Sequence, residues 1–223
     1  MFKNFVLTID TYIIRPCKSI KLLGTHNRQD FKWDTEVGKL ASTLHNRIFN
    51  IKKLTPYTNF HTRLQFLNGY VIGKLRYMLP LYSNVTQLLM TKLHKIVMTA
   101  ARTAIGNYCC RHSTTQILNK VDWLPIKLMI EHSAINIIHS ILTKKTPNCL
   151  LSLYNMENRR QAKEITTKYL PKTTQFGNFY IYKCIKTYNN LPNLFKIKSK
   201  NVFKKSTKKW LITNGDSIPD SHD

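Results

Sequence analysis

The sequence predicts a mainly α-helical protein that begins with a short β element. Apolar residues recur at helical spacing through residues 34–106, glycine and proline mark the ends of these stretches, and two extended runs precede them. The chain has 223 residues, of which 43% are hydrophobic. This supplies enough apolar material for a sizeable core, so we expect a folded protein.

The first element predicted is extended. Residues 5–23 contain the runs FVLTI and YIIRPCKSIKLL, which are rich in β-branched residues. Pro16 interrupts the second run and Gly24 ends it. We therefore expect a β-hairpin or ribbon before the first helix.

Three amphipathic helices should follow and pack as an antiparallel bundle. The first begins at Asp34 and is closed by Pro56. Its apolar stripe consists of Val37, Leu40, Leu44, Ile48, Ile51 and Leu54. The second covers about 59–79, where Gly69 and Gly73 weaken the helical pattern. The third covers about 84–105 and ends at Gly106, which suits a C-cap.

The rest of the chain predicts more helices. Ser113 can cap a short helix, and Pro125 can open a longer one that Pro147 ends. Residues 154–175 are polar and predict a linker or mobile loop, followed by helices at about 178–190 and 200–212.

The charge balance indicates an anionic partner. The chain has 35 Lys and Arg against 11 Asp and Glu, a formal net charge of +24. No acid lies between Glu36 and Asp122, and none lies between residues 165 and 215. Nucleic acid is the commonest partner of such a chain, with an anionic membrane surface as the lesser alternative. The alternative without a functional role is that a compositionally biased genome enriches the protein in lysine.

The cysteines and the apolar runs indicate the compartment. The five cysteines are scattered and odd in number, which does not suit a disulfide framework. The first ten residues make a poor signal peptide, and no run reaches the roughly 18 apolar residues of a membrane span. We expect an intracellular protein of the nucleus or cytoplasm with no membrane partner.

The last predicted helix carries a basic stripe. It consists of Lys204, Lys205, Lys208 and Lys209, opposite an apolar face that includes Phe203 and Trp210. The ammonium groups could reach successive phosphates. The alternative is a solvated face that covers a docked Phe and Trp.

Catalytic chemistry is not indicated. Cys109, Cys110 and His112, completed by His132 or His139, form the nearest approach to a metal cluster, but adjacent cysteines do not suit a tetrahedral zinc site. The sequence has no DD pair and no close acidic cluster outside its start and its tail that could hold two metal ions, and there is no glycine-rich phosphate loop. We expect no cofactor in this chain and no enzyme activity from the chain alone.

One resemblance goes further. Six segments follow one another along the chain: SIKLLGTHNRQDFKW, RIFNIKKL, LNGYVIGKLRYMLPLY, KLHKIVMTAARTAIG, STTQILNKVDWLPI and TPNCLLSLY. In this order they resemble the region after the palm of non-LTR retrotransposon reverse transcriptases of the jockey-like kind. The stretch from FYIYKCIKTYNNLPNLF to the end of the last helix is similar to their terminal pattern. Departures occur at Asn27, Arg28 and Glu36, where the family usually has an apolar residue, Asp and His.

The resemblance implies a division of the chain. Residues 1–33 would be a β-rich remnant of the palm end, 34–106 a thumb-like three-helix bundle, 107–153 connecting helices, and 154–223 a linker and basic C-terminal helical region. The family's Y/F-A-D-D turn has no counterpart here, so no catalytic residue is carried over. Mg²⁺ would matter only if a separate polymerase chain supplied the palm.

A thumb holds its duplex by the backbone, so cations are the expected contacts. Our candidates in the bundle are Lys52, Lys53, Arg63, Lys74 and Arg76. The segment matching the family's primer grip is Lys21, Leu22, Leu23 and Gly24. Tyr57, Tyr70, Tyr77 and Trp123 could stack on bases, although aromatic residues at helical spacing more often belong to a core.

Three functional hypotheses remain open. The preferred one is a truncated copy of the RNA-directed DNA polymerase that lacks the palm and binds the backbone of RNA, DNA or a hybrid without sequence preference. The second is one piece of an active polymerase whose palm lies on another chain. The third is a protein-interaction remnant or degenerate gene product with no nucleic-acid role.

Overall fold

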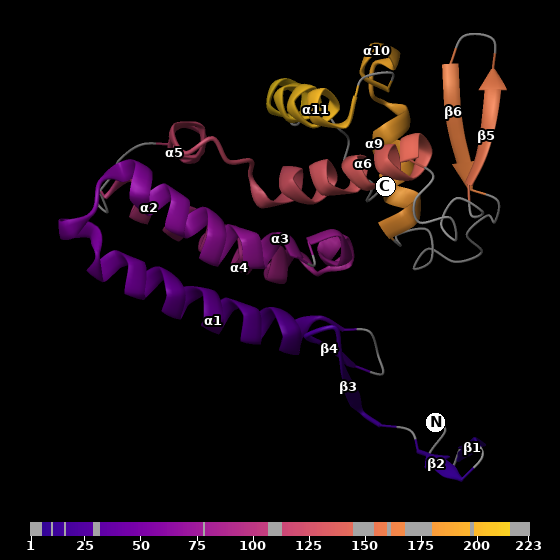
Figure 1. Cartoon of the computed structure of the whole chain (residues 1–223), viewed down its shortest axis with the longest axis horizontal. Coiled ribbons are helices and arrows are strands. Elements are labelled where there is room, and N and C mark those ends of the chain that lie inside the picture. The colour runs from indigo at the N-terminus through magenta and orange to yellow at the C-terminus, as the bar shows by residue number, and fades with distance from the viewer. Residues whose placement is uncertain are drawn as a thin grey trace.

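The computed structural model describes residues 6–9, 11–15, 17–28, 32–77, 79–106, 113–144, 154–159, 162–167, 180–196 and 199–214. The described part is mainly helical, as the sequence predicts, and short hairpins precede the helices (Figure 1). The helices α1 to α4 pack together as a bundle, and α6, α9 and α11 lie to one side of it (Figure 1).

Two antiparallel hairpins form the N-terminal β element. The first pairs β1 (Leu7–Ile9) with β2 (Tyr12–Ile14), and the second pairs β3 (Ser19–Leu22) with β4 (Thr25–Arg28). The sequence predicted extended backbone only as far as residue 23, so β4 is an addition. The turn at Leu23 and Gly24 has φ of 49° and 83°, which is typical of a type I′ hairpin turn.

The second hairpin is attached to the first helix by a carboxylate. The backbone N–H of His26 donates to Glu36 Oε2 at 2.8 Å, and Glu36 is only 8% exposed. Glu36 lies in the first turn of α1 (Asp34–Lys53), where a negative charge is favourable. The helix begins and ends where the apolar pattern predicts, and its predicted stripe is buried from Val37 to Ile51, while Leu54 is 45% exposed.

The second predicted helix is interrupted in its middle. It consists of α2 (Phe60–Leu67), a π-helical segment (Asn68–Ile72) and α3 (Gly73–Tyr77). Asn59 caps α2 by accepting from the backbone N–H of Thr62 at 2.8 Å. In the π segment, the Tyr70 carbonyl oxygen accepts from Arg47 Nη1 at 2.6 Å. The arginine of α1 therefore binds the irregular part of the neighbouring helix.

The third bundle helix is α4 (Gln87–Ile105), which follows a 3₁₀ turn (Leu79–Asn84). It starts three residues later than predicted because Thr86, with extended backbone and its hydroxyl accepting from the Leu89 N–H, is the N-cap. It ends at Gly106, as predicted, with φ of 78°.

The helices α5 and α6 begin at the residues that the sequence signals predict. Ser113 and Gln116 form a capping box at the start of α5 (Thr114–Lys120). Pro125 directly precedes α6 (Ile126–Lys144), and its carbonyl accepts from the Met129 N–H at 2.8 Å. The predicted stop at Pro147 lies outside the described residues.

The prediction of a linker or loop at 154–175 is wrong for its first part. Residues 154–159 and 162–167 form an antiparallel hairpin of β5 (Tyr154–Arg159) and β6 (Ala162–Thr167). Buried Ile165 and the amide of Asn189 anchor it to the next helix, because Asn189 accepts from the Ile165 N–H and donates to the Ile165 carbonyl. Residues 168–175 lie outside the described part.

The remaining helices are α9 (Tyr180–Asn189), the short α10 (Asn193–Lys196) and α11 (Lys200–Asn214). The predicted apolar face of α11 is confirmed, since Phe203, Thr207 and Leu211 are fully buried. Phe203 stacks on the buried ring of His139 in α6, with 3.7 Å between ring centroids.

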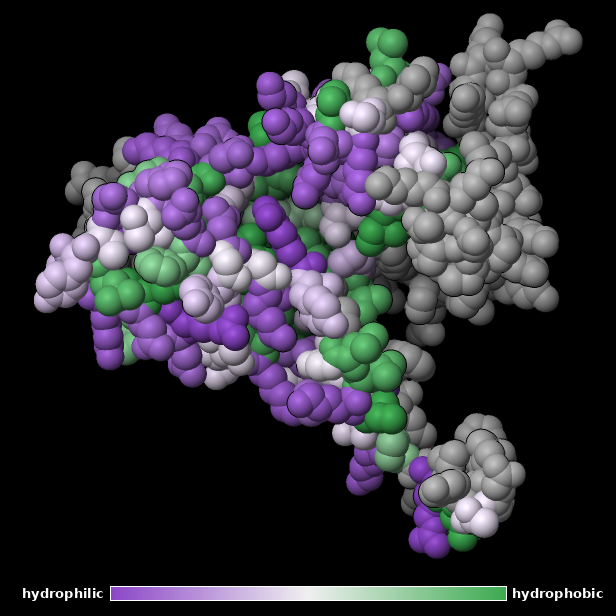
Figure 2. All heavy atoms as spheres, viewed as in Figure 1, coloured by the Kyte–Doolittle hydropathy of each residue, from purple (hydrophilic) through white to green (hydrophobic). Residues whose placement is uncertain are grey.

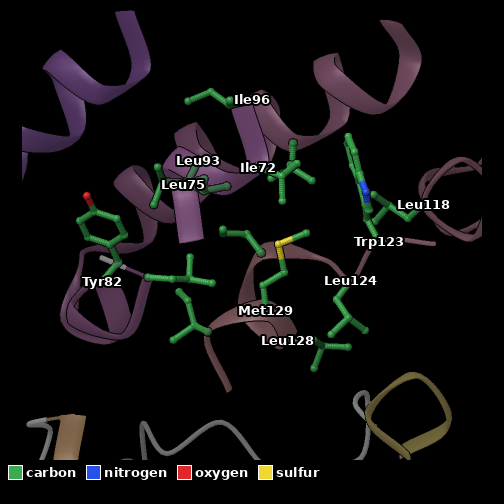
Figure 3. Packing of buried hydrophobic residues seen from close by; sticks show 14 of the residues in the cluster. Ile72, Leu75, Tyr82, Leu93, Ile96, Leu118, Trp123, Leu124, Leu128 and Met129 are labelled. Atoms are coloured by element: carbon green, nitrogen blue, oxygen red, sulfur yellow. The ribbon is translucent and has the colours of Figure 1, made fainter. Parts of the chain in front are cut away.

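One hydrophobic cluster joins all the helices from α1 to α6, α9 and α11. Figure 3 shows its centre, where Leu75 of α3, Leu93 of α4 and Met129 of α6 converge. The segments 34–106, 107–153 and 154–223, treated separately in the sequence, share this core. None of the helices in the described part combines the length and apolar character needed to cross a membrane.

Candidate nucleic-acid interface

A groove between α1 and α4 gathers cationic and polar side chains. We name it the α1–α4 groove; its volume is about 450 Å³ and it is lined by His45, Asn46, Ile48, Phe49, Lys52, Thr99, Arg102 and Thr103. Because the bundle runs up, down and up, α1 and α4 point the same way and their C-terminal ends lie together (Figure 1). Lys52 and Arg102 therefore face the same groove from two helices.

The residues that line this groove include no Asp or Glu. Its lining residues fall within the acid-free stretch between Glu36 and Asp122. Lys52 and Arg102 each lie in the last turn of their helix, where the helix dipole favours a positive charge. The groove is thus a favourable location for these two cations.

An aromatic ring forms part of the same wall. Phe49 is 57% exposed, and the Lys53 ammonium stands over its ring at 4.7 Å from the centroid. Lys53 is exposed beside the groove but does not line it. The groove therefore offers a flat apolar surface next to the cations.

Arg63 does not belong to a phosphate-binding surface, contrary to the sequence prediction. It is only 8% exposed, and its guanidinium donates to the carbonyls of Ala104 (3.0 Å), Thr55 (3.2 Å) and Thr58. These carbonyls lie where α1 ends, α2 begins and α4 ends. Arg63 joins three helix ends, so its charge serves the fold.

Lys74 and Arg76 project from α3. Lys74 is exposed, with its ammonium 5.7 Å from the centroid of the Tyr77 ring. Partial burial lowers the pKa of Arg76 from its usual value, whereas the charge of Asp122 raises it. The structure therefore places Arg76 near the turn before α6, separate from the α1–α4 groove.

The lysines of α11 form a second basic surface. We name Lys204, Lys205, Lys208 and Lys209 the α11 stripe; all except half-buried Lys208 are exposed. Lys208 Nζ lies 2.6 Å from Asp122 Oδ2 and donates to the Asp122 carbonyl at 2.7 Å. Three lysines of the stripe thus remain outward, and the fourth fastens α11 to the α5–α6 turn.

His132 of α6 lies within the same cationic neighbourhood. Its Nε2 is 2.9 Å from the carbonyl oxygen of Lys204. Burial lowers the pKa of His132, and the charges of Lys204, Arg76 and Lys208 lower it further, although the backbone hydrogen bond raises it. Neutral His132 therefore suits the docking of α11.

The primer-grip-like segment is the turn of the second hairpin. Lys21 and Leu22 end β3, and Leu23 and Gly24 form the turn; all four are exposed. Tyr77 Oη donates to the Leu23 carbonyl at 3.1 Å, which ties the turn to α3. Figure 2 shows an apolar patch at this hairpin, where Ile20, Leu22 and Leu23 are 57%, 57% and 72% exposed.

The aromatic candidates divide into two groups. Trp123 is buried, and its indole N–H donates to Asn68 Oδ1 at 3.0 Å, so it is a core residue. Tyr57, Tyr70 and Tyr77 are exposed by 85%, 59% and 56%. None of these three lines the α1–α4 groove, whereas Phe49, which the sequence analysis did not single out, does.

Arg102 was also missed. Its signal is present in the sequence, because Lys95, Thr99 and Arg102 recur at spacings of four and three residues on one face of a helix without acids. The facing residues of α1 could not be assigned before the helices were packed.

The metal cluster considered in the sequence lies mostly outside the described residues. Cys109, Cys110 and His112 lie outside the described residues. His139 is buried against Phe203, and His132 binds the backbone of α11. Within the described ranges, no three His, Cys, Asp or Glu side chains gather as metal ligands.

The fold and these surfaces define a class: a mainly helical, strongly basic protein with two cationic surfaces on one shared core. Comparison with protein-family models, curated proteins and solved structures gives no match.

Proposed function

We propose that this chain binds the phosphate backbone of nucleic acid without sequence preference, as a helical unit that resembles the thumb region of a reverse transcriptase. The observation that carries the proposal is the convergence of Lys52 and Arg102, from two helices, on one groove. Cations in that arrangement suit phosphates, and contacts to phosphates carry no sequence information.

The α11 stripe is a second cationic surface. Lys204, Lys205 and Lys209 are exposed, and the bonds of Lys208 to Asp122 hold the helix against the core. A fixed helix presents its lysines as a fixed row, which suits successive phosphates better than a mobile tail does. With Lys52 and Arg102 in the groove and the three outward lysines of the stripe, the two surfaces offer five cations. If all five contact phosphates, log affinity should fall against log salt with a slope of about −3.5 to −4.5.

The test is a fluorescence-anisotropy titration against single-stranded RNA, duplex DNA and an RNA–DNA hybrid over a salt series. The double variant Lys52→Ala/Arg102→Ala removes the groove cations, and Lys204→Ala/Lys205→Ala/Lys209→Ala removes the outward stripe. Each should flatten the slope, the double variant by about 1.5.

The matched control is Lys39→Ala/Lys186→Ala, which removes two exposed charges outside both surfaces. It should leave the slope nearly unchanged. Equal flattening in the control and the groove variant would mean that only the net charge matters. Weak binding to all three ligands at about 50 mM salt would refute the proposed function.

A second candidate function is protein docking through the second hairpin. The specific observation is its apolar tip, in which Leu22 and Leu23 are exposed although Tyr77 and Glu36 hold the hairpin in place. In this case, Leu22→Ser/Leu23→Ser would abolish association with the partner, and the groove variants would not affect it.

A further inference from the structure

We infer that the α1–α4 groove accepts an unpaired nucleotide, with its base stacked on Phe49 and the flanking phosphates on Lys52 and Arg102. The inference rests on the proposed function and adds a ligand class to it: single-stranded RNA or DNA, or an unpaired nucleotide within a longer ligand. The core does not explain the presence of Phe49, because Leu44, Ile48 and Ile51 form the buried face of this part of α1 without it.

The first argument is the nature of the groove. A volume of about 450 Å³ lies within the range of small-molecule sites and suits a single nucleotide unit. The wall combines a flat ring, two cations and polar groups of Asn46 and Thr99. The ring of Phe49 suits the base, the two cations suit the phosphates, and the polar groups of Asn46 and Thr99 suit the sugar hydroxyls.

The second argument is the surroundings of the ring. Phe49 is 57% exposed although it borders a bundle with a well-filled core. The Lys53 ammonium at 4.7 Å lies over the ring and increases the local positive charge. An aromatic ring with cations around it is the usual platform for an unpaired base, whose neighbouring phosphates are negative.

The third argument concerns which nucleic acids can use such a platform. In a duplex, each base is stacked between its neighbours and paired, so its face is not available to a side chain. In a single strand, the base can leave the stack and lie on the ring. The ring should therefore contribute to single-strand binding and not to duplex binding.

The experiment compares a single-stranded oligonucleotide with a blunt duplex of equal length, using the full chain. Phe49→Leu keeps an apolar side chain but removes the ring, and should weaken single-strand binding about tenfold while changing duplex binding less than twofold. Phe49→Tyr should retain binding. Phe60→Leu is the control, since Phe60 is exposed at the start of α2 but does not line the groove.

A second readout identifies the contact. A single strand containing 5-iodouracil, irradiated in the complex, should cross-link to the peptide that contains Phe49, and an excess of unlabelled strand should suppress the product. Cross-links confined to α11 would overturn the inference.

These measurements distinguish a failure of the stacking inference from a failure of the proposed function. If Phe49→Leu leaves single-strand affinity unchanged while Lys52→Ala/Arg102→Ala reduces it, the groove binds backbone only, and the inference fails while the proposed function stands. Equal losses for single strand and duplex would also overturn the inference. If the unaltered chain binds neither ligand, both proposals fail.

Discussion

Replacing Arg63 with methionine should lower the free energy of unfolding by about 4 kcal/mol and leave nucleic-acid affinity nearly unchanged. The methionine retains much of the apolar stem but removes all donors. The guanidinium bonds to the carbonyls of Ala104, Thr55 and Thr58 are lost together. Hydrogen bonds to charged groups contribute about 1.5–3 kcal/mol each.

The magnitude follows from the burial of each bond. The bond to Ala104 is buried, so its loss should cost about 2 kcal/mol. The bonds to Thr55 and Thr58 are part-buried, and water can replace the donor there, so about 1 kcal/mol is assigned to each. For a chain of this size, the melting temperature should fall by about 8–16 °C.

The assay is urea unfolding followed by circular dichroism, together with the anisotropy titration used for the groove variants. Arg63→Lys should be intermediate, because an ammonium keeps the charge but cannot reach three carbonyls with a planar fork. A loss of stability below about 1 kcal/mol, combined with a fall in affinity, would refute the structural role and return Arg63 to the nucleic-acid interface.

A double-mutant cycle tests the same junction from the side of α4. A Cβ at Gly106 would lie 3.0 Å from Arg63 Nη2, and the φ of 78° is unfavourable for alanine. Gly106→Ala should cost about 2 kcal/mol in the native background and less in the Arg63→Met background, where the close contact is absent. Strict additivity would show that Gly106 and Arg63 do not act together.

Three further predictions concern the second half of the chain. Ser113→Ala removes the capping box of α5 and should lower the free energy of unfolding by about 1 kcal/mol in urea titration; no loss would mean that α5 depends on packing alone. The pKa values of His132 and His94 are lowered by burial, so the unfolded chain binds protons more readily, and stability should fall as pH decreases below about 6.5, the ordinary pKa of histidine. His132→Gln should reduce this pH dependence in melting temperature, and an unchanged profile would contradict the assignment. The pair of Lys208 and Asp122 is partly solvated, with the Asp122 side chain 83% exposed, so the coupling in a double-mutant cycle should be no more than about 1 kcal/mol and should decrease with salt. Coupling that does not change with salt would contradict a solvated ion pair.

The helices could be predicted because each contains two agreeing signals. In α1 the apolar spacing and Asp34, taken as an N-cap residue, indicated the start to within one residue, because the N-cap is Trp33; in α4 the apolar spacing and Gly106 indicated the end. The hairpin of β5 and β6 could not be predicted, because its polar sequence lacks alternation and its anchor is Asn189, 24 residues beyond Ile165.

The candidate site was predicted only in part for a related reason. A sequence shows that Arg63 is positively charged but not that the carbonyl of Ala104, 41 residues away, will accept from it. Lys52 was identified from its charge alone. That Phe49 and Arg102 line the same groove becomes apparent only when α1 packs beside α4. Charge patterns therefore identify the kind of partner, and packing decides which cations remain available.

The π segment at Asn68–Ile72 has a consequence for insertions and deletions in this chain. A π segment is equivalent to an α-helix with one additional residue, so the chain holds one residue of spare length between α2 and α3. Deleting Gly69 would convert the segment to ordinary α-helix while α2 and α3 keep their buried faces. The affected contacts would be those of the bulge itself, above all the bond from Arg47 to the Tyr70 carbonyl. A gene encoding this bundle can thus lose a codon in mid-helix without exchanging the inner and outer faces of the helix.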